Sequence, residues 1–203
     1  MKRNLSCLVL VGMIPLIFTG CMGRMIGEGA EKALGPKGDY WQEKSPAASK
    51  EDKVLAPYTK FVLGQVKNDF GKNVPAEFFT LFPEEFEKVL AKSKLPETDA
   101  GKTLVINVTV IHYEIADKTD NILGPLEQVV ARVELVDKDT NNVLAYGNVI
   151  GRTGKSVGLG VDWKARGLAK GIVKWISDYY PIPENDEEEE IEEENEISEE
   201  DAS

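Results

Sequence analysis

The chain has 203 residues, of which 29% are charged, and a formal net charge of −11. Its two cysteines and single histidine are too few for a typical tetrahedral zinc site. The acidic surplus lies in the last 20 residues, so the remaining body is close to neutral. A neutral body lacks the clustered basic face that nucleic-acid binding needs, which argues against a nucleic-acid partner.

The first 20 residues are typical of a secretory signal peptide. Lys2 and Arg3 give a short positive region, and an apolar run of 14 residues follows from Leu5 to Phe18. That run contains Pro15 and is shorter than the roughly 20 apolar residues of a transmembrane helix. We therefore interpret residues 1–20 as a signal peptide.

The end of this segment, "FTGC", resembles the lipobox of bacterial lipoproteins, with Phe18 where leucine is usual. The resemblance implies cleavage between Gly20 and Cys21, and acylation of the Cys21 thiol and of the new N-terminus by palmitate-like chains. Several acyl chains give lasting membrane attachment, whereas one chain binds only marginally. Because Met22 rather than aspartate follows, we expect anchoring in the outer membrane with the domain facing the periplasm. The alternative is a soluble secreted protein with a cysteine near its cleavage site.

Residues 21–53 predict a flexible tether, because they are rich in glycine and show no sustained periodicity. About 30 such residues have a root-mean-square reach of roughly 30 Å. We interpret Tyr40 and Trp41 as contacts of this tether with either the domain or the membrane interface.

Residues 54–183 predict one α+β domain. A β-rich segment over 58–66, after Pro57, predicts the first strand. Residues 74–93 then change to a helical rhythm, with Pro83 either kinking the helix or starting its second half. The apolar stripe of this helix is typical of a core and consists of Phe78, Phe82, Phe86, Val89 and Leu90.

Three further strands are expected over 102–117, 128–137 and 143–153. The first has apolar residues on both faces, which favours a central position in the sheet. The second alternates between a buried set and a half-exposed set that contains Gln128, Arg132 and Glu134. The turn "KDTNN" between the last two strands predicts a hairpin.

A final amphipathic helix is predicted from Val161 to Tyr180. Gly167 and Gly171 lie beside its apolar stripe, and each costs roughly 1 kcal/mol in a helix interior. We therefore expect these glycines to allow close approach to a neighbouring element. Pro181 and Pro183 end the helix.

The predicted order is β-α-β-β-β-α. We expect a two-layer sandwich in which a mixed four-stranded sheet carries both amphipathic helices on one face. The crossover through the first helix makes the first two strands parallel.

Residues 184–203 contain 13 acidic and no basic side chains, a density that predicts a disordered tail. The simpler interpretation is a solvated tail that aids solubility. The alternative is weak binding of cations or of a basic partner.

The segment "GRTGKS", Gly151 to Ser156, contains the residue types of a phosphate-binding loop. A Walker-type loop has a glycine five positions before its Gly-Lys-Ser element, and here Val149 holds that position. Four residues, 157–160, also separate the segment from the following helix. We therefore predict a glycine-rich connection and no nucleotide-binding residue.

The sequence predicts no catalytic residue, no metal ligand and no cofactor. Any histidine-dependent device must use His112, and no free thiol remains, because Cys7 leaves with the signal and Cys21 carries lipid. His112 and Glu114 share a strand face, so a proton relay through them stays an alternative. Four loop carboxylates do not follow the spacing of a calcium loop: Asp117, Asp120, Asp137 and Asp139.

The segments "LAPYTKFVL", "NDFGKNVPAEF", "LVINVTV" and "VVARVELVDKDTNNVLA" together resemble a family of uncharacterised bacterial lipoproteins defined by a domain of unknown function. The resemblance covers roughly Leu55 to Tyr180 and brings no catalytic residues. The element order is also similar to envelope lipoproteins of secretion and assembly machines, such as the curli-export type, but no long amphipathic hairpin for a barrel is visible.

These features predict a membrane-anchored, non-catalytic binding or assembly module of the cell envelope with an envelope protein as partner. Two alternatives stay open. One is an envelope enzyme that uses His112 with nearby carboxylates, which requires His112 in a cleft. The other is a carrier of an apolar ligand beneath the phenylalanine-rich helix.

Overall fold

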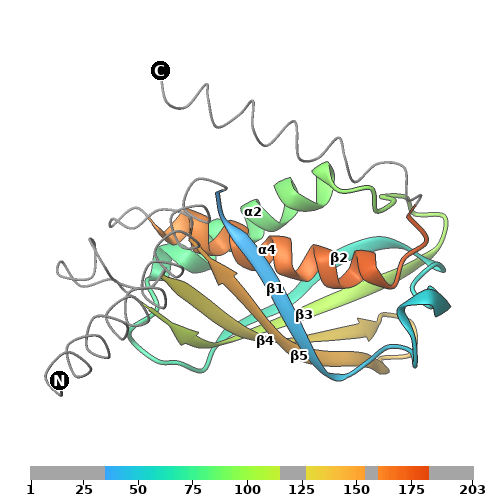
Figure 1. The fold of residues 1–203 in the computed structure, drawn as a ribbon, viewed down its shortest axis with the longest axis horizontal. Coiled ribbons are helices and arrows are strands. Elements are labelled where there is room, and N and C mark those ends of the chain that lie inside the picture. The colour runs from blue at the N-terminus through green and yellow to red at the C-terminus, as the bar shows by residue number, and fades with distance from the viewer. Residues whose placement is uncertain (1–34, 115–126, 154–159, 183–203) are drawn as a thin grey trace, which may run out of the picture.

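The computed structural model describes residues 35–114, 127–153 and 160–182, which form one sheet and two long helices (Figure 1). The mixed α+β class with two helices is confirmed, but the sheet has five strands rather than four. In chain order the elements are β1 Lys37–Lys44, the 3-10 turn η1 Lys50–Asp52, β2 Tyr58–Asn68, α2 Ala76–Lys92, β3 Lys102–Tyr113, β4 Gln128–Asp137, β5 Val143–Arg152 and α4 Gly160–Asp178.

The strands lie in the order β1-β5-β4-β3-β2. The pair β2 and β3 is parallel, as the crossover through α2 predicted. The strands β3, β4 and β5 form an antiparallel meander, and β1 pairs antiparallel with the outer edge of β5. The β3 strand is interior but not central, because β4 holds the middle position.

The unexpected strand β1 comes from residues that were predicted to belong to the tether. Half of its eight residues are charged. Exposed and half-buried residues alternate along most of the strand, and the inner face has no large aliphatic side chain. Edge strands tolerate charge and need only one partner, so they leave a weak pattern in sequence. The folded domain therefore starts before residue 54, and the segment between Cys21 and β1 is only residues 22–36.

Both helices cover the same face of the sheet, and the hydrophobic core lies between the two layers (Figure 1). The phenylalanine stripe of α2 is part of this core, because its three inward rings are at most 1% exposed. Pro83 lies inside a single continuous helix. The fully buried side chains of the core include Phe78, Phe82, Leu104, Ile106, Val108, Val110, Val129, Ala131, Val133, Leu135, Leu168, Ile172, Trp175 and Ile176.

The sequence predicted that the glycines of α4 allow close approach to a neighbouring element. The structure shows that this element is β1. A Cβ atom on Gly38 would lie 2.1 Å from the backbone nitrogen of Gly171 and 2.2 Å from the carbonyl oxygen of Gly167. Beyond this contact, the Tyr40 ring stacks on Trp175 with a centroid distance of 5.5 Å. Tyr40 therefore pins the chain to the domain.

The C-terminal end of α4 is joined to β1 and η1 by polar contacts. The hydroxyl of Tyr40 and the ammonium of Lys50 both bond to the Asp178 carboxylate. Burial and the bond to Asp178 raise the pKa of Tyr40 to about 12. Gln42 donates to the Tyr179 hydroxyl at 2.6 Å, so β1 is held along its length.

Candidate binding face

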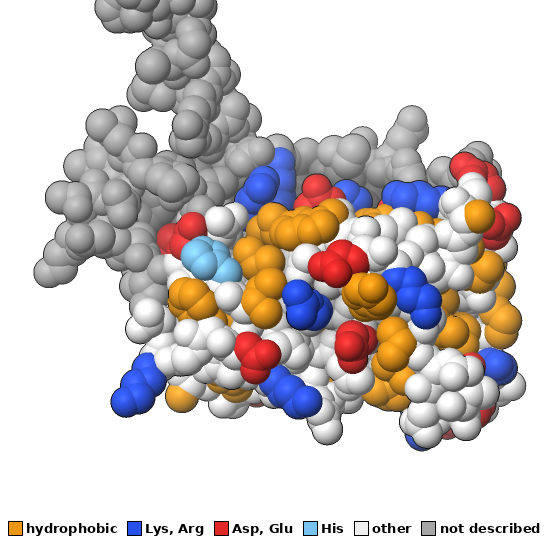
Figure 2. Space-filling model, turned by 90° about the horizontal axis from the view of Figure 1, so that it is seen from below, with side chains coloured by type: hydrophobic (Ala, Val, Ile, Leu, Met, Phe, Trp, Pro, Cys, Tyr) orange, Lys and Arg blue, Asp and Glu red, His pale blue; other side chains and the backbone are white. Residues whose placement is uncertain are grey.

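The face of the sheet that carries no helix is a mixed surface of aliphatic and polar side chains. On β4, Val130, Arg132 and Glu134 lie on this open face, while the residues between them are fully buried. This confirms the two sets predicted for that strand. Figure 2 looks onto the open face, where hydrophobic side chains lie among basic and acidic ones. Antiparallel sheets commonly leave one face to solvent in this way.

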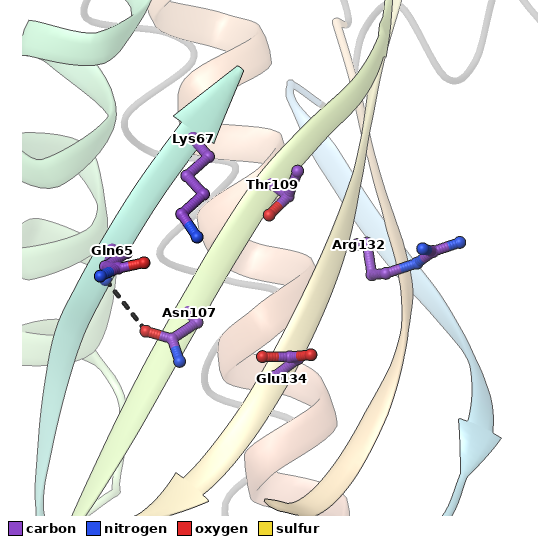
Figure 3. A pocket seen from close by; sticks show the side chains of 6 residues that line it. All are labelled: Gln65, Lys67, Asn107, Thr109, Arg132 and Glu134. Carbon is purple, nitrogen blue, oxygen red and sulfur yellow. Dashed lines mark hydrogen bonds between the residues drawn. The ribbon is translucent and has the colours of Figure 1, made fainter. Parts of the chain in front are cut away.

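A hollow of about 140 Å³ lies on the open face, across β2, β3 and β4 (Figure 3). Its lining is entirely polar and places two residues of each strand side by side. The pairing register puts Thr109 opposite Arg132 and Asn107 opposite Glu134. The lining residues are Gln65, Lys67, Asn107, Thr109, Arg132 and Glu134.

The orientation of Asn107 is set by an irregularity in β2. The register of β2 against β3 shifts between Leu63 and Val66, as in a bulge. The backbone N–H of Gln65 then donates to Asn107 Oδ1 at 3.0 Å. A Cβ atom on Gly64 would lie 2.3 Å from that oxygen, so a larger residue there would push the Asn107 side chain aside.

The charged groups of the hollow have no ionic partner within the described parts of the chain. Lys67, Arg132 and Glu134 form no ion pair with another described residue. By contrast, Lys60 on the same strand as Lys67 is paired with Asp99. The hollow therefore keeps two cations and one carboxylate available to a ligand.

His112 lies on the open face, beyond the hollow and with a side chain 41% exposed. Its ring packs edge-on against Phe70 at 5.3 Å, and its Nε2 lies 3.3 Å from Glu114 Oε1. His112 and Glu114, which were expected to share a strand face, therefore lie in contact. The enzyme alternative required His112 in a cleft, and the structure places it on an open surface instead.

A buried ion pair closes the end of the domain where α4 begins. The Lys164 ammonium bonds to the Glu127 carboxylate, and their side chains are 3% and 7% exposed. The same ammonium donates to the Glu114 carbonyl at 2.6 Å and lies 4.4 Å from the centre of the Tyr113 ring. Burial raises the pKa of the Tyr113 hydroxyl, and the nearby Glu127 charge adds to this. Sequence analysis missed this pair, because a lysine in an amphipathic helix is usually solvated, although Lys164 lies one turn before Leu168 at the edge of the buried stripe.

Two more carboxylates have structural partners. Burial tends to raise the pKa of Glu85 on α2, but Arg166 at 2.7 Å and Lys88 at 2.8 Å outweigh it and lower that pKa. Asp137, considered above as a calcium ligand, instead accepts from the Tyr58 hydroxyl at 2.6 Å. That bond, the backbone N–H of Thr140 and the Lys102 ammonium hold the pKa of Asp137 well below its usual range.

Several predicted features lie outside the described residues: the lipidation site Cys21 with its cleavage partner Gly20, the acidic tail 184–203, and the Gly154–Ser156 part of "GRTGKS". The other half of that segment ends β5 at Arg152. Within the described residues, neither helix is long and apolar enough to span a bilayer.

No protein-family model matches this chain, and no curated protein matches it either. Among solved structures, two of the PelC dodecamer from Paraburkholderia phytofirmans are similar over 68% of this chain and 96% of theirs. The sequence identity is 15% and the TM-score is 0.42 in both cases. At this level of similarity, neither the function nor the assembly of that protein is transferred to this chain.

Proposed function

We propose that this chain is a lipid-anchored, non-catalytic module of the bacterial cell envelope that binds an envelope partner through the open face of its sheet. Cys21 is the proposed attachment site, in the outer membrane with the domain in the periplasm. The observation that carries the binding role is the uncovered face, where aliphatic side chains alternate with unpaired charged ones. Protein interfaces have this mixture of apolar and polar area.

A binding role accounts better for this face than a catalytic one. Among the described residues, His112 is 41% exposed and lies in no enclosed space in which a base could act on a substrate away from water. The phenylalanine stripe of α2 fills the core with rings stacked on one another, such as Phe78 on Phe82 at 5.7 Å. That packing leaves the open face as the best supported place for recognition.

Site-specific photo-crosslinking in intact cells tests this proposal. A photoreactive residue in place of Val130, on the open face, is expected to give a discrete crosslinked product. The same residue in place of Lys92, exposed at the end of α2, serves as the matched control and is expected to give none. Equal products from both positions would contradict a role for the open face.

The anchor is tested in the same strain. Cys21→Ser is expected to abolish labelling by a fatty-acid analogue, because the thiol that carries the lipid is gone. Continued labelling of that variant would contradict attachment through Cys21, whatever the crosslinking shows.

A further inference from the structure

The bulge in β2 fixes the orientation of the Asn107 side-chain amide, which lines the hollow. Bulges in sheets often re-aim a side chain next to a functional site. Here the Gln65 N–H binds the side-chain oxygen of Asn107 instead of a backbone carbonyl of β3. A glycine in a strand interior weakens the strand, but a Cβ atom on Gly64 would displace the Asn107 side chain from its present position. The Asn107 Nδ2 group is thereby left as a donor on the open face.

Other donors lie around this amide. Figure 3 shows the Lys67 ammonium turned toward β3, beside Thr109 and Asn107. The Arg132 side chain also lines the hollow, but its guanidinium extends from β4 over β5, away from Lys67 and Asn107, so it lies at the edge of the hollow. The two cations and the single carboxylate give the hollow a formal charge of +1. Because charge-assisted hydrogen bonds to oxyanions are stronger than neutral ones, this set favours an anionic oxygen group.

Glu134 adds a second requirement to the ligand. Its carboxylate lies opposite Asn107 in the sheet register and has no ion-pair partner among the described residues. It repels a bare anion but accepts a hydrogen bond from a hydroxyl or amino group. A volume of about 140 Å³ suits a small group of this kind, and an open hollow admits a group that belongs to a larger molecule.

We propose that this hollow binds a phosphate or carboxylate that carries a neighbouring hydroxyl or amino group. The inference rests on the proposed function, because it names the chemistry of a ligand that binds on the same open face. A soluble glycerol phosphate and the headgroup of a phospholipid share this chemistry, and the experiment separates them.

The test follows the side-chain amide signals of Asn107 by NMR in the purified mature chain, residues 21–203, carrying Cys21→Ser. Glycerol 3-phosphate is expected to shift these signals in a saturable way, while glycerol is expected to leave them unchanged. Inorganic phosphate is expected to bind more weakly, because it offers Glu134 no alcohol donor. No saturable shift with glycerol 3-phosphate would overturn the inference.

Variants assign the effect to the hollow. Lys67→Gln is expected to weaken binding of glycerol 3-phosphate about tenfold, the usual size for one charge-assisted bond. Glu134→Gln is expected to remove the preference for glycerol 3-phosphate over inorganic phosphate. Lys60→Gln, on the same strand but outside the hollow, is the matched control and is expected to bind like the wild type. Equal losses in Lys60→Gln and Lys67→Gln would show a general charge effect and overturn the site.

Vesicles identify the source of the ligand. The same unlipidated chain is sedimented with phosphatidylcholine vesicles that contain phosphatidylglycerol. Cosedimentation that Lys67→Gln abolishes assigns the site to a headgroup, and binding of glycerol 3-phosphate alone assigns it to a soluble ligand. A crosslink from Val130 that persists when both assays are negative would remove this inference and leave the proposed function standing.

Discussion

The two ion pairs formed by Lys164 and Lys88 differ in environment at the level of single residues. Lys164 and its partner Glu127 are almost completely buried, whereas the Lys88 side chain is 60% exposed. Removing one partner of a buried pair leaves an uncompensated charge in a medium of low dielectric constant. Loss of Lys88 is expected to cost little, because its ammonium is exposed and the buried Glu85 carboxylate keeps Arg166 as a partner at 2.7 Å.

We therefore expect Lys164→Met to lower the free energy of unfolding by about 3–5 kcal/mol, as for other broken buried pairs. The double variant Lys164→Met with Glu127→Leu is expected to recover most of this loss, since no charge then remains buried. Lys88→Met is the control and is expected to unfold close to the wild type. Urea unfolding of the full chain measures all four proteins. A double variant no more stable than the single one would contradict this account.

The sequence predicted the orientation of single residues that line the hollow, but it did not predict the hollow itself. The alternation of β4 correctly predicted that Arg132 and Glu134 point away from the core. Nothing in the local pattern indicated that Lys67 and Asn107 would join them, because strand order and register decide which side chains meet. The bulge at Gln65 also breaks the period-two rule on which such a prediction rests.

Among the secondary-structure elements, agreement with the sequence follows the strength of each hydrophobic pattern. The strand β4 and the helix α2 have clear periodicities, and their predicted bounds hold to within two residues. The strand β1 has no such pattern, because it is stabilised by backbone contact with α4 rather than by aliphatic side chains. The glycines of α4 were visible in the sequence, but their partner was not.

The contact between β1 and α4 can be tested with one methyl group. Gly38→Ala places a Cβ atom against the backbone of α4, which cannot move as a flexible side chain could. Overpacking of this kind costs typically about 1–3 kcal/mol, although alanine alone favours a strand over glycine. We expect a lower urea midpoint for Gly38→Ala and no such loss for Lys37→Ala, whose side chain is exposed on the same strand. Equal midpoints for the wild type and Gly38→Ala would contradict close packing at this position.

The domain has two opposite ends, called poles below, which are defined by the ends of β1 and α4. One pole contains the start of β1, where Lys37 pairs with Arg152, together with the start of α4. The other pole contains the end of α4, where Asp178 bonds to Lys50. The proposed lipid is therefore attached at the first pole and the acidic tail at the second. Because anionic headgroups repel an acidic segment, the tail charge favours an orientation with the second pole away from the membrane.

Fluorescence quenching on vesicles tests this orientation. A twelve-residue strand such as β3 spans about 40 Å, while a 15-residue tether has a root-mean-square reach of only about 21 Å. A label on Lys72→Cys, exposed in the turn after β2, is therefore expected to be quenched more strongly by a headgroup-bound quencher than a label on Lys138→Cys. Both lysines are exposed and lie in turns, so the two substitutions remove the same charge from similar positions. With the proposed removal of Cys7 and lipidation of Cys21, the introduced cysteine is the sole free thiol of the mature chain.

The same two labels on a chain with Cys21→Ser give the control, in which neither is quenched. Raising the ionic strength screens the repulsion between the tail and the headgroups, so the difference between the two labels is expected to shrink with salt. Deleting residues 184–203 is expected to have the same effect in low salt. Equal quenching of both labels in the lipidated chain at low salt would mean that the domain turns freely on its tether and that the two poles impose no orientation.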